Sequence, residues 1–175
     1  MKVRLFLILS LAGLFISFSS CRKVTSAAAE LLSTTDTAGF IFPAPLGSVS
    51  DFEEILTAEQ IRELDSIIVQ FENNSDNKIN IVTTKSIKPY TSLDEYSADL
   101  LKNWENDDVE VHTVMLVYSK KLNEVEITAG DELKRKLTDK ECKRIAKKTI
   151  VAETEKSDYF TGLKTALIKI ITEIR

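Results

Sequence analysis

Three helix-start signals constrain most strongly how this 175-residue chain can fold. In a capping box, a Ser or Thr side chain accepts a backbone hydrogen bond from the third residue on, and a Glu or Gln there bonds back to the cap. The pattern occurs at Thr57–Gln60, Ser92–Glu95 and Thr138–Glu141, each followed by apolar residues at helical spacing. Ser157 is expected to cap a fourth helix. One face of that helix carries Phe160, Leu163, Leu167, Ile170 and Ile174.

Three strand candidates lie between the first and third predicted helices. Residues 78–84 are rich in β-branched side chains. Residues 111–118 contain the unbroken apolar run Val114–Val117, which is typical of a central strand covered on both faces. Glu124–Thr128 alternates between polar and apolar, which favours a strand with one exposed face, joined to its predecessor as a hairpin. The predicted fold class is α/β (α+β), a small mixed β-sheet flanked by helices in the order α-β-α-β-β-α-α.

The first 20 residues have the charge order of an export signal. Lys2 and Arg4 precede an apolar run of about 14 residues, which is shorter than the roughly 20 that a membrane-spanning helix requires. The run ends in Ser19-Ser20-Cys21 and resembles a bacterial lipobox, with Phe18 where Leu is usual. We therefore expect residues 1–20 to be a lipoprotein signal peptide and Cys21 to be lipidated. The alternatives are a secreted protein cleaved nearby, with Cys21 an ordinary thiol, and a hydrophobic peptide buried in the fold.

The remaining chain divides into a tether and one domain. Residues 21–48 contain Ser, Thr, Ala, Gly and two prolines with no sustained periodicity, as expected of a tether. Its short apolar exception, residues 40–42, is expected to dock on the domain. Residues 49–175 have the length of a single domain.

Charge and cysteine content exclude several classes of function. Loss of residues 1–20 removes two bases and no acid, so the formal charge falls from −4 to −6, and nucleic acid is not an expected partner. Lipidation of Cys21 would leave Cys142 without a disulfide partner. Cys142 lies on the apolar face of the third predicted helix and is interpreted as a small core side chain. A Cys/His pair would have to use His112, the only histidine, which we instead place at a strand entrance.

Short motifs in a fixed order span residues 49–174. The set resembles the TPM domain family, named for its thylakoid-lumen, photosystem-repair and acetylcholine-receptor-modulating members. The pieces that carry the resemblance are Val49–Asp51 with Ile55–Thr57, Ile79–Thr83, Trp104, Val114–Val117, Ile127–Gly130 with Leu133 and Leu137–Asp139, and Asp158–Leu163.

The chain also departs from the family pattern where the family carries glycines. Glu105-Asn106-Asp107 stands where Gly-Ile-Gly often follows the tryptophan, and His112-Thr113 stands where Asn-Gly often precedes the buried strand. Glu132 replaces the second glycine after Gly130, and Lys134 replaces a family glutamate. Glycines permit close backbone approach and positive φ. Their replacement is compatible with the fold and weakens the case for an inherited active site.

The resemblance implies two chemistries, calcium binding through clustered carboxylates and acid phosphatase activity. Calcium takes several oxygen ligands, so carboxylates from different loops would have to converge. The family pattern points to Asp51 and Asp139, with Asp107, Asp131 and Asp158 in neighbouring loops. The simpler interpretation is that Asp139 favours the helix dipole and that Asp51 is solvated. No independent phosphatase motif occurs in the sequence, so a calcium-linked hydrolase using Asp51 and Asp139 is the alternative function and enzymatic activity stays open.

The function expected first is that of a binding module. An acidic domain tethered beside a membrane can contact membrane-protein complexes without catalysis, and the resemblance implies a role in their assembly or quality control. The expected location is the cell envelope, with the domain lipid-anchored and facing the periplasm or the exterior.

Overall fold

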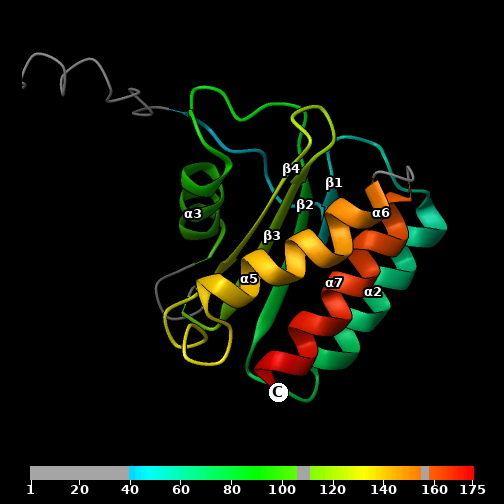
Figure 1. Cartoon of the computed structure of the whole chain (residues 1–175), viewed down its shortest axis with the longest axis vertical. Coiled ribbons are helices and arrows are strands. Elements are labelled where there is room, and N and C mark those ends of the chain that lie inside the picture. The colour runs from blue at the N-terminus through cyan, green and yellow to red at the C-terminus, as the bar shows by residue number, and fades with distance from the viewer. Residues whose placement is uncertain (1–39, 106–110, 155–157) are drawn as a thin grey trace, which may run out of the picture. The chain divides into compact units, whose positions relative to one another are not determined.

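The computed structural model describes residues 40–105, 111–154 and 158–175 (Figure 1). Its sheet has four strands in the spatial order β1-β2-β3-β4. The first three run parallel, and β4 returns antiparallel to β3 through a tight hairpin. The strands are β1 (Val49–Asp51), β2 (Lys78–Thr83), β3 (Thr113–Ser119) and β4 (Glu124–Ala129).

Helices cover the sheet on both faces (Figure 1). α3 packs on one face, and α2, α5 and α7 pack on the other. A five-residue π-helix, η1, continues α5 into the short α6. The helical elements are α2 (Ala58–Glu72), α3 (Leu93–Trp104), α5 (Asp139–Ala146), η1 (Lys147–Val151), α6 (Ala152–Thr154) and α7 (Tyr159–Ile174).

The two parallel crossovers, β1-α2-β2 and β2-α3-β3, have opposite hands. The strand order advances steadily from β1 to β3, yet α2 and α3 lie on opposite faces. One crossover is therefore left-handed, against the strong right-handed preference of such units. The loops after β1 and β2 consequently leave the carboxyl edge of the sheet toward opposite faces. In α/β sheets this divergence marks the usual place for a ligand crevice.

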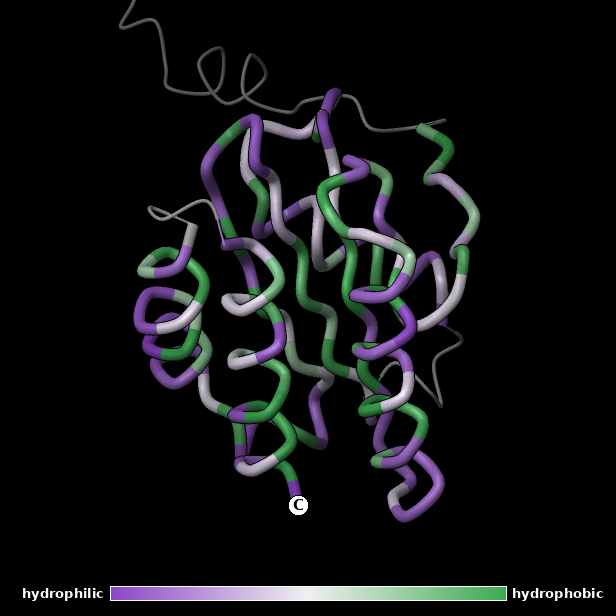
Figure 2. The backbone as a smooth tube through the Cα atoms, turned by 90° about the vertical axis from the view of Figure 1, so that its right-hand side faces the viewer, coloured by the Kyte–Doolittle hydropathy of each residue, from purple (hydrophilic) through white to green (hydrophobic). Residues whose placement is uncertain are grey.

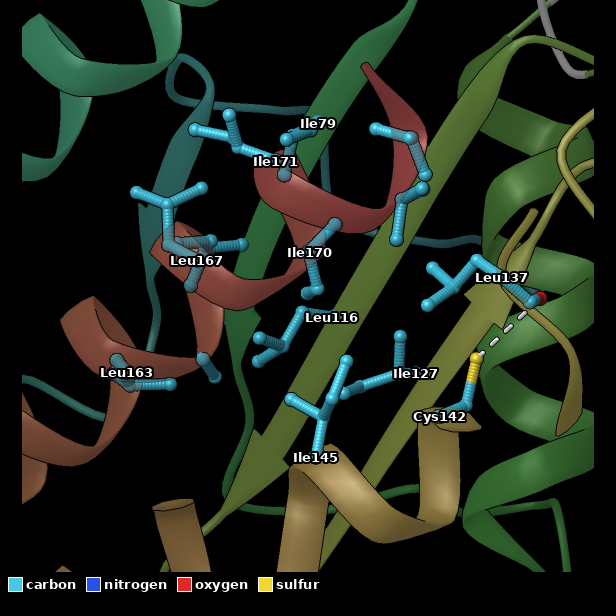
Figure 3. Packing of buried hydrophobic residues seen from close by; sticks show 14 of the residues in the cluster. Ile79, Leu116, Ile127, Leu137, Cys142, Ile145, Leu163, Leu167, Ile170 and Ile171 are labelled. Atoms are coloured by element: carbon cyan, nitrogen blue, oxygen red, sulfur yellow. Dashed lines mark hydrogen bonds between the residues drawn. The ribbon is translucent and has the colours of Figure 1, made fainter. Parts of the chain in front are cut away.

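The larger core lies between the sheet and α2, α5 and α7. Leu116 in the middle of β3 is completely buried, and its side chain points toward Ile145 of α5 and Ile170 of α7 (Figure 3). Apolar segments run through the strands, while the helices carry hydrophilic residues among hydrophobic ones (Figure 2). All seven residues of β3 are buried, which confirms the central strand predicted from the apolar run.

The smaller core lies between the sheet and α3, and the segment before β1 completes it. Phe40 and Phe42 pack edge-on against each other at 4.9 Å, and each lies 5.7 Å from the Tyr90 ring. The Trp104 indole Nε1 donates a hydrogen bond of 2.8 Å to the Pro43 carbonyl. The expected docking of this segment is confirmed for the two phenylalanines, whereas Ile41 between them points into solvent.

The capping signals locate the helix starts correctly. Both halves of the capping box form at Thr57 and Thr138. Ser92 accepts from the Glu95 amide, but the Glu95 carboxylate bonds to Thr91 instead of closing the box. The prediction for the last helix was wrong by one residue, because Asp158 supplies the cap by accepting from the Thr161 amide at 3.0 Å. Ser157 lies outside the described residues.

η1 and α7 approach each other closely at Gly162, which lies within the Asp158–Leu163 motif. A Cβ on Gly162 would lie 3.2 Å from the Ile150 Cα, which is tighter than most Cβ contacts, so a larger residue there would push the two helices slightly apart. Within the described ranges, no helix is long and apolar enough to cross a bilayer.

Candidate functional site

Asp51 lies at the carboxyl edge of the sheet, where a ligand crevice would be expected, but its carboxylate is turned inward. It is 8% exposed and accepts hydrogen bonds from the Ile55 and Leu56 amides at 3.3 and 2.8 Å. The Thr83 hydroxyl at the end of β2 donates to the same carboxylate. Asp51 therefore fixes the turn between β1 and α2.

Glu53 completes this network, although its position before the first helix suggested only a solvated side chain. Its carboxylate accepts from the Lys120 and Lys121 amides at 2.7 and 2.9 Å, and its own amide donates to the Thr83 hydroxyl at 3.0 Å. It thus joins the β1–α2 turn to the β3–β4 hairpin, 67 residues farther along the chain. Together Asp51, Thr83 and Glu53 use their buried oxygens to hold loops together.

The other predicted carboxylates lie in separate places. Asp139 is the first residue of α5 and is exposed. Asp131 forms a 2.6 Å ion pair with Lys134, and that hydrogen bond lowers the pKa of the Asp131 carboxyl. Asp158 caps α7. Asp107 lies outside the described residues.

The structure does not bring Asp51 and Asp139 together. Asp51 ends the edge strand β1, and Asp139 lines a hollow along β4 at the other edge. Three inter-strand spacings of about 4.8 Å, or about 14 Å, separate the two edges. No group of three or more His, Cys, Asp and Glu side chains suited to a metal ion occurs within residues 40–105, 111–154 and 158–175.

Cys142 packs as a core side chain. It is 3% exposed, and its Sγ lies 4.0 Å from the Leu137 carbonyl oxygen (Figure 3). Burial, reinforced by the nearby carboxylates of Asp139 and Glu126, raises the pKa of the thiol to about 12. A thiol held neutral in this way is a poor nucleophile.

A groove runs along the outer edge of β4 and is here named the β4 groove. Two adjoining hollows of about 430 and 390 Å³ form it, each within the size range of ligand sites. They share Asp94, Glu126, Ile127 and Lys143, so they are continuous along the strand. One wall comes from α3 and the other from α5 and η1. The groove residues outside β4 are Ser92, Leu93, Asp94, Ala98, Lys134, Asp139, Cys142, Lys143, Ala146, Lys147 and Val151.

The floor of the β4 groove presents backbone polar groups. The Gly130 amide donates to the Thr113 carbonyl, so these two residues form a hydrogen-bonded pair of the β3–β4 ladder and the next residue of β4, Ala129, does not. Because hydrogen-bonded pairs alternate in an antiparallel ladder, Val125, Ile127 and Ala129 direct their N–H and C=O groups away from β3. Among the described residues, no hydrogen bond joins these groups to another element. The Glu126 carboxylate accepts from the Ile127 amide beside it.

The two walls differ in charge. Side chains of Glu124 and Glu126 alternate with those of the core-facing residues and so lie toward α3, which adds Asp94. The opposite wall carries Lys143 and Lys147. Burial, followed by the charge of Asp94, raises the pKa of Glu126, and Lys143 opposes this only in part. Only Asp139 of the groove residues was a sequence-derived candidate, because no motif marks a sheet edge.

Comparisons with known proteins agree with this fold. Similar solved structures include an N-terminal domain from P. gingivalis (19% identity, TM-score 0.66, covering 72% of this chain and 80% of that one). Others are the N-terminal domain of cg2496 from Corynebacterium glutamicum (12%, TM-score 0.59, 77% and 86%) and the BA42 protein of Bizionia argentinensis (17%, TM-score 0.59, 70% and 83%). No curated protein matched.

The family comparison covers nearly the whole domain. The family model of the TPM domain, which carries the name TPM phosphatase, matches residues 49–173. The match begins with β1 and includes all the strands and helices of the described fold, except for the last residue of α7. The chain belongs to the TPM domain family.

Proposed function

We propose that this chain is a membrane-tethered binding module of the cell envelope, and that its TPM domain contacts a membrane-protein partner through the β4 groove. The observation that carries the proposal is the open edge of β4 between two helical walls. Soluble proteins normally cover, shorten or charge such edges, because unpaired N–H and C=O groups attract other strands. The edge of β4 is left open within a groove of this size, which is suited to a partner.

The positions and hydrogen bonds of the carboxylates favour a binding function over hydrolysis. A metal-assisted hydrolase requires oxygen ligands that converge around the reacting group. Asp51 is engaged with two amides and a hydroxyl, and Asp139 belongs to the opposite edge of the sheet. Glu53, the other buried carboxylate at the carboxyl edge, is engaged with two hairpin amides. The alternative of a calcium-linked phosphatase therefore has no ready-made site in these residues.

Anchoring is the second part of the proposal. A lipid on Cys21 would be separated from Phe40, where the docked segment begins, by 19 residues of chain. Fully extended, that length spans at most about 65 Å. The domain would therefore stay close enough to the bilayer to contact the exposed part of a membrane protein.

Two measurements on the full chain separate the functions. A photo-reactive amino acid in place of Lys147, on the groove wall, should cross-link a discrete membrane protein in native membranes. The same group in place of Val69, which is 50% exposed on α2, should not. Phosphate release from p-nitrophenyl phosphate, with and without calcium, tests the alternative. Equal labelling from both positions, or calcium-dependent turnover that Asp51→Asn abolishes, would contradict the binding function.

A further inference from the structure

We propose that the β4 groove binds an extended segment of a partner protein as a fifth strand, and that this segment alternates basic residues facing α3 with apolar residues facing α5. This inference rests on the proposed function and deepens it by naming the mode of recognition and the chemistry of the partner. Strand addition is a recurrent way to bind peptides, in which the backbone supplies affinity and alternate side chains supply specificity.

The backbone geometry supports strand addition. Val125, Ile127 and Ala129 present their N–H and C=O groups outward along one side of β4. Six residues of strand extend about 20 Å, enough to pair with a segment of about six residues. Every residue of β4 from Glu124 to Ala129 lines one of the two hollows, so open space adjoins the strand along its whole length.

The walls determine what the added side chains should be. Along an added strand, successive side chains point alternately to the two faces of the sheet. Those facing α5 meet Val125, Ala146 and Val151 and would be apolar, and Lys143 and Lys147 on the same wall disfavour a basic residue there. Those facing α3 meet the acidic side chains of Asp94, Glu124 and Glu126 and would be basic. No Lys, Arg or His of the described residues lies on the α3 wall of the hollows, and Lys143 on the opposite wall offsets the charge of Glu126 only in part.

The state of Glu126 agrees with this assignment. Its charge is opposed by burial and by Asp94, which together raise the pKa of its carboxyl group. A basic side chain from a partner would offset both effects. The Glu126 carboxylate also accepts a hydrogen bond from the Ile127 amide, and the carbonyl of an added strand would have to replace it as the acceptor.

Charge argues against two other occupants of the β4 groove. If a second copy paired its own β4 around a two-fold axis, Glu124 and Glu126 of both copies would lie on the same face, and like charges opposite one another are destabilising. The chain's own segment 22–39 has its only bases at Arg22 and Lys23, which are adjacent. Adjacent residues of a strand point to opposite faces, so they cannot both face α3.

The test uses two capped seven-residue peptides, one alternating valine with lysine and one alternating valine with glutamate. Each is titrated into the full chain in mild detergent, and binding is followed by hydrogen exchange of the Val125, Ile127 and Ala129 amides. The valine–lysine peptide should bind at least tenfold more tightly and should protect these amides. Val125→Pro removes one outward N–H and should weaken binding at least tenfold, whereas Val125→Ala, which loses a similar side chain, should keep it.

Reversal of charge provides the specificity test. Glu126→Lys should shift the preference toward the valine–glutamate peptide. Equal affinity for both peptides, or binding without amide protection, would overturn the proposed chemistry. Concentration-dependent dimerisation that protects β4 without peptide, or β4 protection that is lost on deletion of residues 22–39, would assign the groove to another occupant. If Val125→Pro keeps the Lys147 cross-link in membranes, strand addition is wrong while the binding function stands.

Discussion

Truncation of Leu116 to alanine tests whether β3 is the centre of the fold. Leu116 is fully buried and is paired on both sides, with Ile81 of β2 and Ile127 of β4. Helices α5 and α7 cover it, so the surrounding groups cannot easily collapse into the space that the lost atoms leave (Figure 3). Leu→Ala in such a site costs about 2–5 kcal/mol, and we expect at least about 3 kcal/mol here.

The assay is urea or thermal unfolding followed by circular dichroism. For a domain of this length, about 3 kcal/mol corresponds to a fall in Tm of roughly 10 °C. Val69→Ala is the matched control, because Val69 is half exposed on α2, and it should change the free energy of unfolding by no more than about 0.5 kcal/mol. A similarly small change for Leu116→Ala would mean that this strand does not organise the core.

Three further predictions concern the anchor, the β4 groove and calcium. Cys21→Ser should release the protein from membranes, because each buried lipid methylene contributes about 0.8 kcal/mol; stable membrane association of the variant in fractionation would refute lipidation. Because the pKa of Glu126 is raised in the folded state, this group stabilises the fold at low pH. That contribution to the free energy of unfolding is lost as the pH rises through the raised pKa. Glu126→Gln should therefore have a higher Tm than the wild type at pH 7, and the difference should vanish below about pH 4. Asp139→Asn should lower stability by about 0.3–1 kcal/mol through the helix dipole, equally with and without millimolar calcium; a calcium-dependent rise in wild-type Tm that Asp139→Asn removes would instead establish a metal ligand.

Local signals in the sequence predicted most of the fold. Cap residues act within one turn of the chain, so Thr57, Ser92 and Thr138 located three helix starts. The apolar run in β3 and the alternation in β4 likewise follow from which faces are covered. β1 was missed, because three residues give no periodicity and its identity as a strand depends on pairing with β2. The π-helix was missed for a similar reason, since the Lys147–Val151 sequence carries no distinguishing pattern.

The candidate site was harder to predict, because it depends on residues far apart in the chain. Asp51 and Asp139 were proposed as partners from their resemblance to family motifs, yet sequence order does not reveal that they belong to opposite edges of the sheet. Glu53 acts through two backbone amides 67 and 68 residues away, which no side-chain motif records. The β4 groove arises from the strand order and from two helices on opposite faces, and only the folded chain shows it.

The central claim is that this domain works by binding along the edge of β4. The most direct measurement is hydrogen exchange by mass spectrometry on the full chain in its native membranes, compared with the same chain purified in mild detergent. Binding along this edge predicts that protection in the membranes increases over Glu124–Ala129 and not over the exposed face of α2 near Val69. Identical exchange of β4 in both states, with increased protection elsewhere on the domain, would contradict it.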